Sequence, residues 1–235
     1  MGLTDLTNIP KIMRVNGWLD GAVLMEKWFT GPATAMPAYT SPDLSTIRMD
    51  KWALTFPRAK TVFDGMVADK LWSSEKAKRD VWPGLVHKLG FSRGGLSFDL
   101  SLKTVQEQHE LHVNHKPVET GLSFHLDDMV AALGNFSIYV APLAGEIAPE
   151  GSRVRVKLTS VGFHIMDSYD FEGSQSLGYW DEATNTASAI YMWSGTSVGN
   201  DTFRDWRDKH KMGGDFKVFS DVKTVTLNPP DSFLV

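Results

Sequence analysis

The sequence predicts an α+β fold, in which a helical N-terminal part is followed by a mainly antiparallel β-sheet with one late helix. Two observations predict this class. Helical apolar spacing recurs through much of residues 1–92, whereas residues 93–235 contain several stretches with the alternation of half-buried strands. In addition, helices and strands do not alternate regularly, as they would in a doubly wound parallel sheet. We therefore expect a single domain over residues 1–235, with its candidate site in the β-rich part.

The N-terminal part should begin with a helix. Asn8 suits an N-cap and Pro10 suits the first helical turn, while Gly17 predicts a break soon afterwards. The next expected elements are a proline-containing loop, a short strand and two helices, the second of them interrupted or restarted at a proline: residues 31–42, 50–56, 60–71 and 74–89 with Pro83.

The clearest strand signal lies in residues 153–158, where arginine and lysine alternate with valine and leucine. Such alternation places three cations on one face, toward solvent, and the aliphatic side chains in the core. The other elements expected in this part are strands near residues 96–100, 111–113, 135–141, 216–218 and 222–227, and helices at 127–133 and 200–211.

The composition excludes several classes of protein. The net charge of −4 comes with no long basic stretch, so we expect no nucleic-acid partner. The absence of cysteine excludes disulfides and thiolate chemistry. No apolar run approaches the roughly 18 residues of a spanning helix, and the N-terminus lacks the pattern of a secretory signal. We expect a protein made in the cytoplasm without a transmembrane segment.

Asp167, Tyr169 and Asp170 form the best candidate site, because they end a long apolar strand just before a turn at Gly173. Two carboxylates at a strand end can hold a hard divalent cation such as Mg²⁺ or act as acid and base, and a phenol can orient a phosphate or carbonyl oxygen. Strand alternation puts Asp167 and Tyr169 on one side and Asp170 on the other. The structural alternative is an ordinary β-turn built from turn-forming residues.

Arg204 and Arg207 lie three residues apart in the late charged helix, with Phe203 and Trp206 on another face. The functional interpretation is that one of the arginines reaches the Asp167–Asp170 turn as an ion-pair partner or as an anion clamp. The structural alternative is a solvated amphipathic helix docked by its aromatic residues.

Three histidines at intervals of three, His109, His112 and His115, raise the question of a metal site. On a strand the first and third share a face and the second points away, so this run alone does not supply three convergent ligands. We favour polar strand and turn residues. A metal site would need His125 or His164 as further ligands.

Short segments spread over nearly the whole chain resemble a proteobacterial family of unknown function whose members tend to be encoded near type VI secretion genes. The segments are Ile9–Lys11, His112–Asn114, Ala132–Phe136, Asp167–Phe171, Leu177–Trp180, Gly213–Phe216 and Phe219–Asp221. The resemblance implies a biological setting and no particular reaction.

A second, narrower similarity concerns Asp167, Tyr169 and Asp170, which match the Asp-x-Tyr-Asp core of colicin M-type bacteriocins. Those proteins cleave the lipid-linked peptidoglycan precursor and need a divalent cation. Their signature continues with His-Arg where this chain has Ser176-Leu177. The expected acid–base histidine is therefore missing, and Arg204, Arg207 or His210 could replace it only through the fold.

The resulting hypothesis is an antibacterial effector, made in the cytoplasm and exported by type VI secretion, with the secretion apparatus or an immunity protein as partner. As an enzyme it would hydrolyse a cell-envelope phosphodiester or pyrophosphate. Asp170 would be the metal-dependent catalytic carboxylate, Asp167 its partner, Tyr169 an orienting group, and Arg204 or Arg207 an anion-stabilising group. The alternatives are a non-catalytic immunity protein, adaptor or chaperone-like accessory, and a carbohydrate-binding module suggested by the eight tryptophans.

Overall fold

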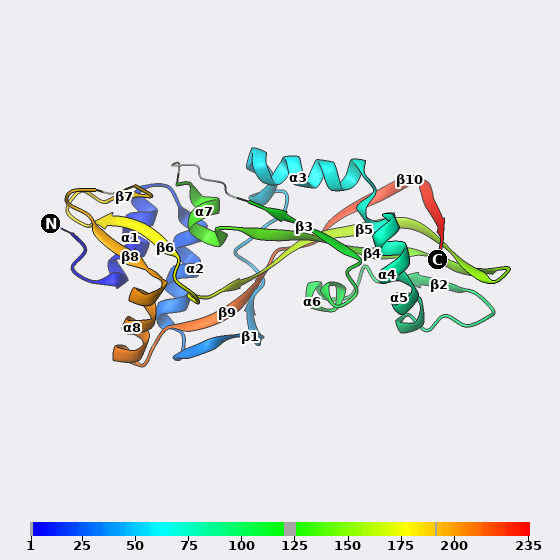
Figure 1. Ribbon diagram of the computed structural model, residues 1–235, viewed down its shortest axis with the longest axis horizontal. Coiled ribbons are helices and arrows are strands. Elements are labelled where there is room, and N and C mark those ends of the chain that lie inside the picture. The colour runs from blue at the N-terminus through cyan, green and yellow to red at the C-terminus, as the bar shows by residue number, and fades with distance from the viewer. Residues whose placement is uncertain (1, 120–125, 191) are drawn as a thin grey trace. The chain divides into compact units, whose positions relative to one another are not determined.

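The computed structural model describes residues 2–119, 126–190 and 192–235 (Figure 1). Most of the helices come before most of the strands, and one late helix, residues 200–210, comes just before the last two strands. The predicted α+β class is therefore confirmed. The chain forms two compact units, each built from three separate stretches. Unit 1 comprises Met1–Ile47, Glu119–Phe136 and Asp167–Val218, and unit 2 comprises Arg48–Val118, Ser137–Met166 and Phe219–Val235. The expectation of a single domain stays a prediction, and the two units are described separately.

The helices of unit 1 begin and end largely where the sequence signals them. Asn8 precedes the first helix, Pro10 lies in its first turn, and Gly17 separates it from the second with a φ of 77°. The second and third helices pack closely, because Gly21 leaves no side chain between them. A Cβ at that position would lie 2.9 Å from the Cβ of Ala131. These helices are α1 (Ile9–Val15), α2 (Leu19–Thr30), α7 (Asp128–Leu133) and α8 (Asn200–His210), and a short 3-10 turn, Leu6–Asn8, precedes α1.

Unit 1 also contains β-structure that the sequence did not reveal. Strand β1 (Thr34–Asp43) pairs in parallel with β9 (Gly214–Phe219), so the loop expected over residues 31–42 is wrong. Its prolines are tolerated because β1 is an edge strand with shifts in register. A separate antiparallel sheet places β6 (Ser176–Asp181) between β7 (Thr186–Ser188) and β8 (Thr196–Gly199).

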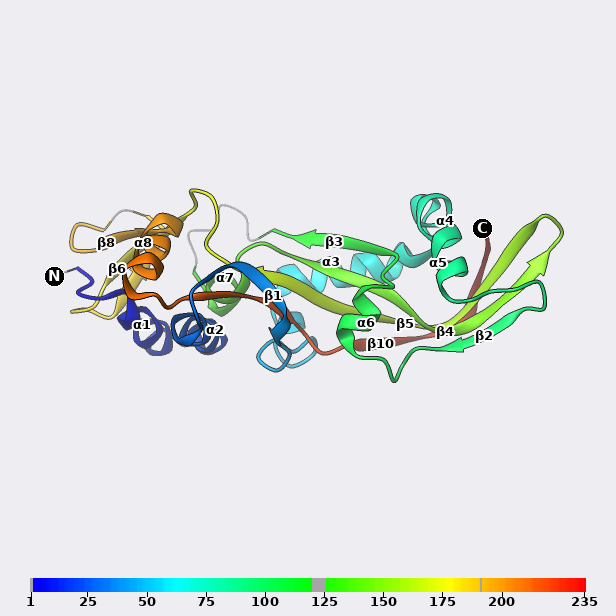
Figure 2. The same cartoon turned by 90° about the horizontal axis from the view of Figure 1, so that it is seen from below.

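Unit 2 is organised around an antiparallel hairpin of two long strands, β4 (Phe136–Glu150) and β5 (Arg153–Tyr169). Figure 2 shows these strands with their neighbours β2 (Leu96–Asp99), β3 (Asn114–Val118) and β10 (Lys223–Leu234). β2 and β3 pair with β4, and β10 pairs with β5. Along β5 the predicted alternation is observed, since Val156 and Leu158 are buried whereas Arg153 and Lys157 are exposed.

The helices of unit 2 correct two predictions. Residues 50–56 form no strand and contain a 3-10 turn, whereas the two helical stretches after them are confirmed, the second broken just before Pro83. Residues 111–113 follow a short helix that a capping box at Thr104 and Glu107 starts, so the strand expected there is also wrong. The helical segments are Ala53–Thr55, α3 (Pro57–Ala68), Leu71–Ser73, α4 (Glu75–Asp80), α5 (Trp82–Lys88) and α6 (Val105–His109).

Candidate functional site: a cavity in unit 1

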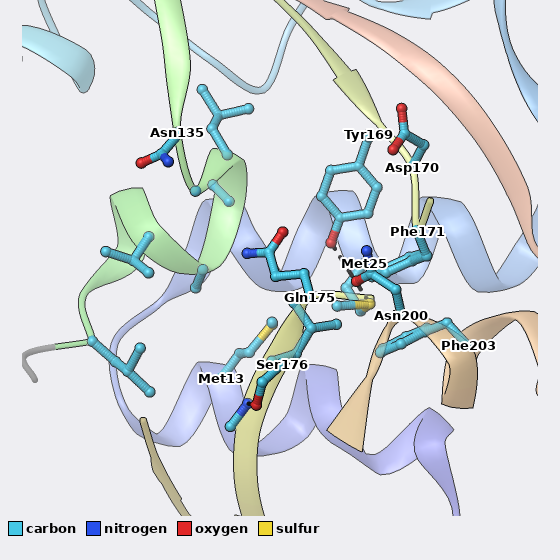
Figure 3. A pocket seen from close by; sticks show the side chains of 18 of the residues that line it. Met13, Met25, Asn135, Tyr169, Asp170, Phe171, Gln175, Ser176, Asn200 and Phe203 are labelled. Carbon is cyan, nitrogen blue, oxygen red and sulfur yellow. Dashed lines mark hydrogen bonds between the residues drawn. The ribbon is translucent and has the colours of Figure 1, made fainter. Parts of the chain in front are cut away.

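The end of β5 enters the wall of a cavity with a volume of about 610 Å³. Asp167, Ser168, Tyr169 and Asp170 all line it, and every other lining residue also belongs to unit 1. The remaining walls come from α1, α2 and α7, from the turn and strand that follow β5, and from the start of α8 (Figure 3). The segment singled out in the sequence therefore borders the cavity.

Asp167 is a half-buried carboxyl with a strongly shifted proton affinity. Its pKa is raised to about 7, mainly by burial and also by the nearby charge of Asp170, while a backbone hydrogen bond from Ser168 and the charge of Lys217 act in the opposite direction. A carboxyl with this pKa exists in both protonation states near neutral pH. It can therefore accept or donate a proton there.

Tyr169 is a buried residue, 8% exposed, and holds its phenol inside the protein. Its hydroxyl donates to the sulfur of Met25 at 3.6 Å, and its ring stacks on Phe216 with centroids 5.2 Å apart. Burial raises the pKa of the phenol above its ordinary value, so the group remains protonated. Figure 3 shows the hydroxyl directed toward Met25. A ligand oriented by Tyr169 would have to replace this contact with Met25.

Asp170 leaves the strand on the side opposite the ring of Tyr169, as Figure 3 shows and as the alternation predicted. Its carboxylate accepts a long hydrogen bond of 3.5 Å from the backbone N–H of Glu172. Burial raises its pKa, and the charges of Asp215 and Glu172 act in the same direction. Asp170 is thus a second carboxyl that is ionised less readily than a solvated one.

Arg204 reaches the turn that follows the candidate site. Its Nη1 donates to the carbonyl oxygens of Phe171 at 2.6 Å and Gly173 at 2.8 Å. The sequence predicted that one arginine of this helix reaches the turn, and Arg204 does so through the backbone. It holds the turn in place and does not line the cavity.

Arg207 lies elsewhere in unit 1 and belongs to a buried network. Its Nη1 forms an ion pair of 2.9 Å with Asp215 and donates to the carbonyl oxygen of Thr34 at 2.6 Å. The indole N–H of Trp28 donates to the same Asp215 oxygen at 2.8 Å. This arrangement stabilises the packing of α8 against β9 and α2. The contacts of Arg207 are therefore structural.

Among the described residues, few side chains are placed to act as ligands for the metal ion that the sequence suggested. In the part of the chain that the structure describes, no three His, Asp or Glu side chains are placed to hold a metal ion. Asp167 and Asp170 would supply two carboxylates at most. Mg²⁺ is commonly held by one or two carboxylates together with waters and substrate phosphates, so this pair fits such an ion only with oxygen ligands from outside the protein.

The histidines of unit 2 form an aromatic cluster. The rings of His109 and His112 stack with centroids 4.9 Å apart, and Nδ1 of His109 lies 3.0 Å from Nε2 of His164. His115 packs against Tyr139 with centroids 5.2 Å apart. The preference for structural residues over a metal site stays a prediction, although His109 lies in a helix and is buried. His125 lies outside the described residues.

The cavity also has walls that the sequence analysis did not connect with Asp167. They come from segments far apart in the chain, and no local pattern marks them. The side chain of Asn200 donates to the carbonyl oxygen of Glu172, and its backbone N–H donates to that of Gln175 at 3.0 Å. The other uncharged lining residues that bear on the chemistry are Met13, Trp18, Met25, Asn135, Phe171, Trp180 and Phe203.

Comparison with known proteins places the chain in a family. The model of a family described as a family of unknown function (DUF6402) matches residues 4–196 and 184–235. No curated protein matches, and no solved structure matches. Within the described ranges, no helix has both the length and the apolar character needed to cross a membrane.

Proposed function

We propose that this chain, which belongs to the family of unknown function DUF6402, is a hydrolase whose active site is the cavity in unit 1. One observation carries the proposal: Asp167, a half-buried residue at the end of a strand, lines a cavity large enough for a small-molecule substrate. Acid–base groups are commonly found in such surroundings, where burial tunes their proton affinity.

Asp167 would be the acid–base residue. In its ionised form it would take a proton from an attacking water, and in its protonated form it would return a proton to the leaving group. Asp170 would bias this equilibrium through its charge. Arg204 would hold the backbone of the turn, so that the two aspartates keep their positions during the reaction.

The biological setting belongs to the same proposal. The protein would be an antibacterial effector, made in the cytoplasm and exported by type VI secretion, with an immunity protein or part of the apparatus as partner. Its support is the resemblance of the chain to proteins encoded near such genes and the match of Asp167, Tyr169 and Asp170 to Asp-x-Tyr-Asp. A phosphodiester or pyrophosphate substrate would have to enter with a divalent cation, because Asp167, Asp170 and Glu172 line the cavity.

Growth of a test bacterium that expresses the protein, in the cytoplasm or fused to a periplasmic signal, tests the proposal. We expect killing in the periplasmic arm that is lost in Asp167→Asn and reduced in Asp170→Asn. Asp208→Asn, which changes an exposed carboxylate of α8 outside the cavity lining, should kill like the parent protein. Circular dichroism should show all three variants folded.

The opposite outcome has a clear meaning. Verified expression without toxicity in either compartment would contradict the effector proposal and favour the non-catalytic alternative, an immunity protein or adaptor. Toxicity that persists in folded Asp167→Asn would instead remove Asp167 from the active site.

A further inference from the structure

We propose that the cavity in unit 1 recognises an organic ammonium ion with an apolar or aromatic body. The inference rests on the proposed function, because it names the class of substrate for the same site. Three acidic residues, Asp167, Asp170 and Glu172, line the cavity. No lysine, arginine or histidine is among its lining residues in the chain ranges that the structure describes.

Three basic side chains of unit 1 are engaged with other groups. Lys217, whose charge reaches Asp167 and Asp170, donates to the hydroxyl of Ser168 at 2.5 Å. Arg204 donates to two backbone carbonyl oxygens of the turn, and Arg207 pairs with Asp215. None of these three cations lines the cavity. In their ionised forms the cavity carboxylates would therefore repel a bound anion and attract a bound cation.

Aromatic rings supply the second part of the argument. Trp18 and Trp180 meet edge to face with centroids 6.2 Å apart, and Phe171 and Phe203 stack at 3.9 Å. All four line the cavity. Aromatic faces attract ammonium groups through the ring quadrupole, and the same rings bury apolar surface. Charge and aromatic character therefore favour the same kind of ligand, with a cationic head and an apolar body.

The remaining lining suits a small molecule. Met13 and Met25 bring thioethers, which adapt to irregular apolar shapes. Gln175 is exposed, and Figure 3 shows its side chain extending into the space between Met13, Met25 and Tyr169. The volume of about 610 Å³ lies within the range of small-molecule sites. A single ammonium compound of modest size is the occupant that these walls fit.

The test compares three probes of nearly equal size and shape: phenethylamine, phenethyl alcohol and phenylpropionate. They differ mainly in charge, which is positive, zero and negative. Binding to the full chain is measured by calorimetry and by quenching of tryptophan fluorescence, because Trp18 and Trp180 line the site. We expect phenethylamine to bind about tenfold or more tighter than the alcohol, equivalent to about 1.4 kcal/mol, and the carboxylate to bind weakest. Asp167→Asn should lower amine affinity by about tenfold and leave alcohol affinity unchanged.

Equal affinity for the amine and the alcohol, or tighter binding of the carboxylate, would overturn the inference. So would unchanged amine affinity in folded Asp167→Asn, for which Asp208→Asn is the matched control. A further arm repeats the phenylpropionate titration with Mg²⁺, and anion binding that appears only with the metal would favour the phosphate substrate instead. Toxicity that depends on Asp167 without amine binding would refute this inference and leave the proposed hydrolase intact. Amine binding without toxicity would support the ammonium site and contradict the proposed hydrolase.

Discussion

Acidification from about pH 7 to about pH 5 should destabilise the protein through one buried residue, His164. Its side chain is fully buried in unit 2, its Nε2 lies 3.0 Å from Nδ1 of His109, and its Nδ1 has no hydrogen-bond partner among the described residues. His109 and His112 face it, and Tyr139 stacks on it with centroids 5.7 Å apart. Protonation would place a positive charge in this cluster, where burial and two further histidines, His109 and His112, disfavour it.

The magnitude follows from the pKa of His164. Burial, followed by the charges of His109 and His112, lowers it from 6.5 to about 3. Between these two pH values the unfolded chain binds a proton at His164 that the folded chain does not. The free energy of unfolding is therefore unaffected by this residue above pH 6.5 and decreases as the pH falls toward 3. At about 1.4 kcal/mol per pH unit, the loss from pH 7 to pH 5 is about 2 kcal/mol.

Urea unfolding followed by circular dichroism at both pH values measures this loss. His164→Gln removes this histidine. Between pH 7 and pH 5 the variant should therefore lose about 2 kcal/mol less stability than the parent protein does. The exposed His87 provides the control, because His87→Gln removes a histidine without removing a buried one. Equal pH dependence in the parent protein and folded His164→Gln would refute the reasoning.

Three further substitutions test the packing of unit 1, each measured by urea unfolding. Gly21→Ala should cost about 1–3 kcal/mol, because the new Cβ would lie 2.9 Å from that of Ala131, and a neutral result would mean that α2 and α7 separate easily. Arg207→Met should cost about 3–5 kcal/mol by leaving Asp215 buried without its cation, and the double variant with Asp215→Asn should recover part of this loss; no recovery would contradict the ion-pair explanation. Arg204→Ala should cost about 1–3 kcal/mol and speed proteolysis of the turn after β5, and unchanged cleavage would show that the turn holds without it.

Local signals in the sequence predicted the elements that depend on local chemistry. Asn8 and Pro10 indicated the first helix, and the alternation around Val156 indicated the longest strand. Strand β1 was missed because its partner β9 lies far away in sequence and its prolines read as a loop. An edge strand needs partners on one side only, which is why those prolines are compatible with it.

The candidate site was likewise predictable where its residues are close in sequence, and not where they come from distant segments. The carboxylates and phenol of Asp167, Tyr169 and Asp170 stood out as a strand-end cluster, and the structure places them in a cavity wall. The opposite walls depend on helix packing between distant segments, which no local spacing encodes. The choice between Arg204 and Arg207 likewise depended on the acceptors that the fold supplies: backbone oxygens for one and Asp215 for the other.

The length of β5 has an evolutionary consequence. Asp167 stands near the end of a strand of 17 residues whose pairing starts beside the glycine turn at Gly151. Because side chains alternate, one residue inserted between the turn and the site would exchange the faces of Asp167 and Ser168 unless a bulge absorbed it. We therefore expect natural variants to tolerate insertions in the hairpin turn, and within β5 only where they come in pairs or with a compensating bulge. The length of this strand, more than its composition, would then be what inheritance has to preserve.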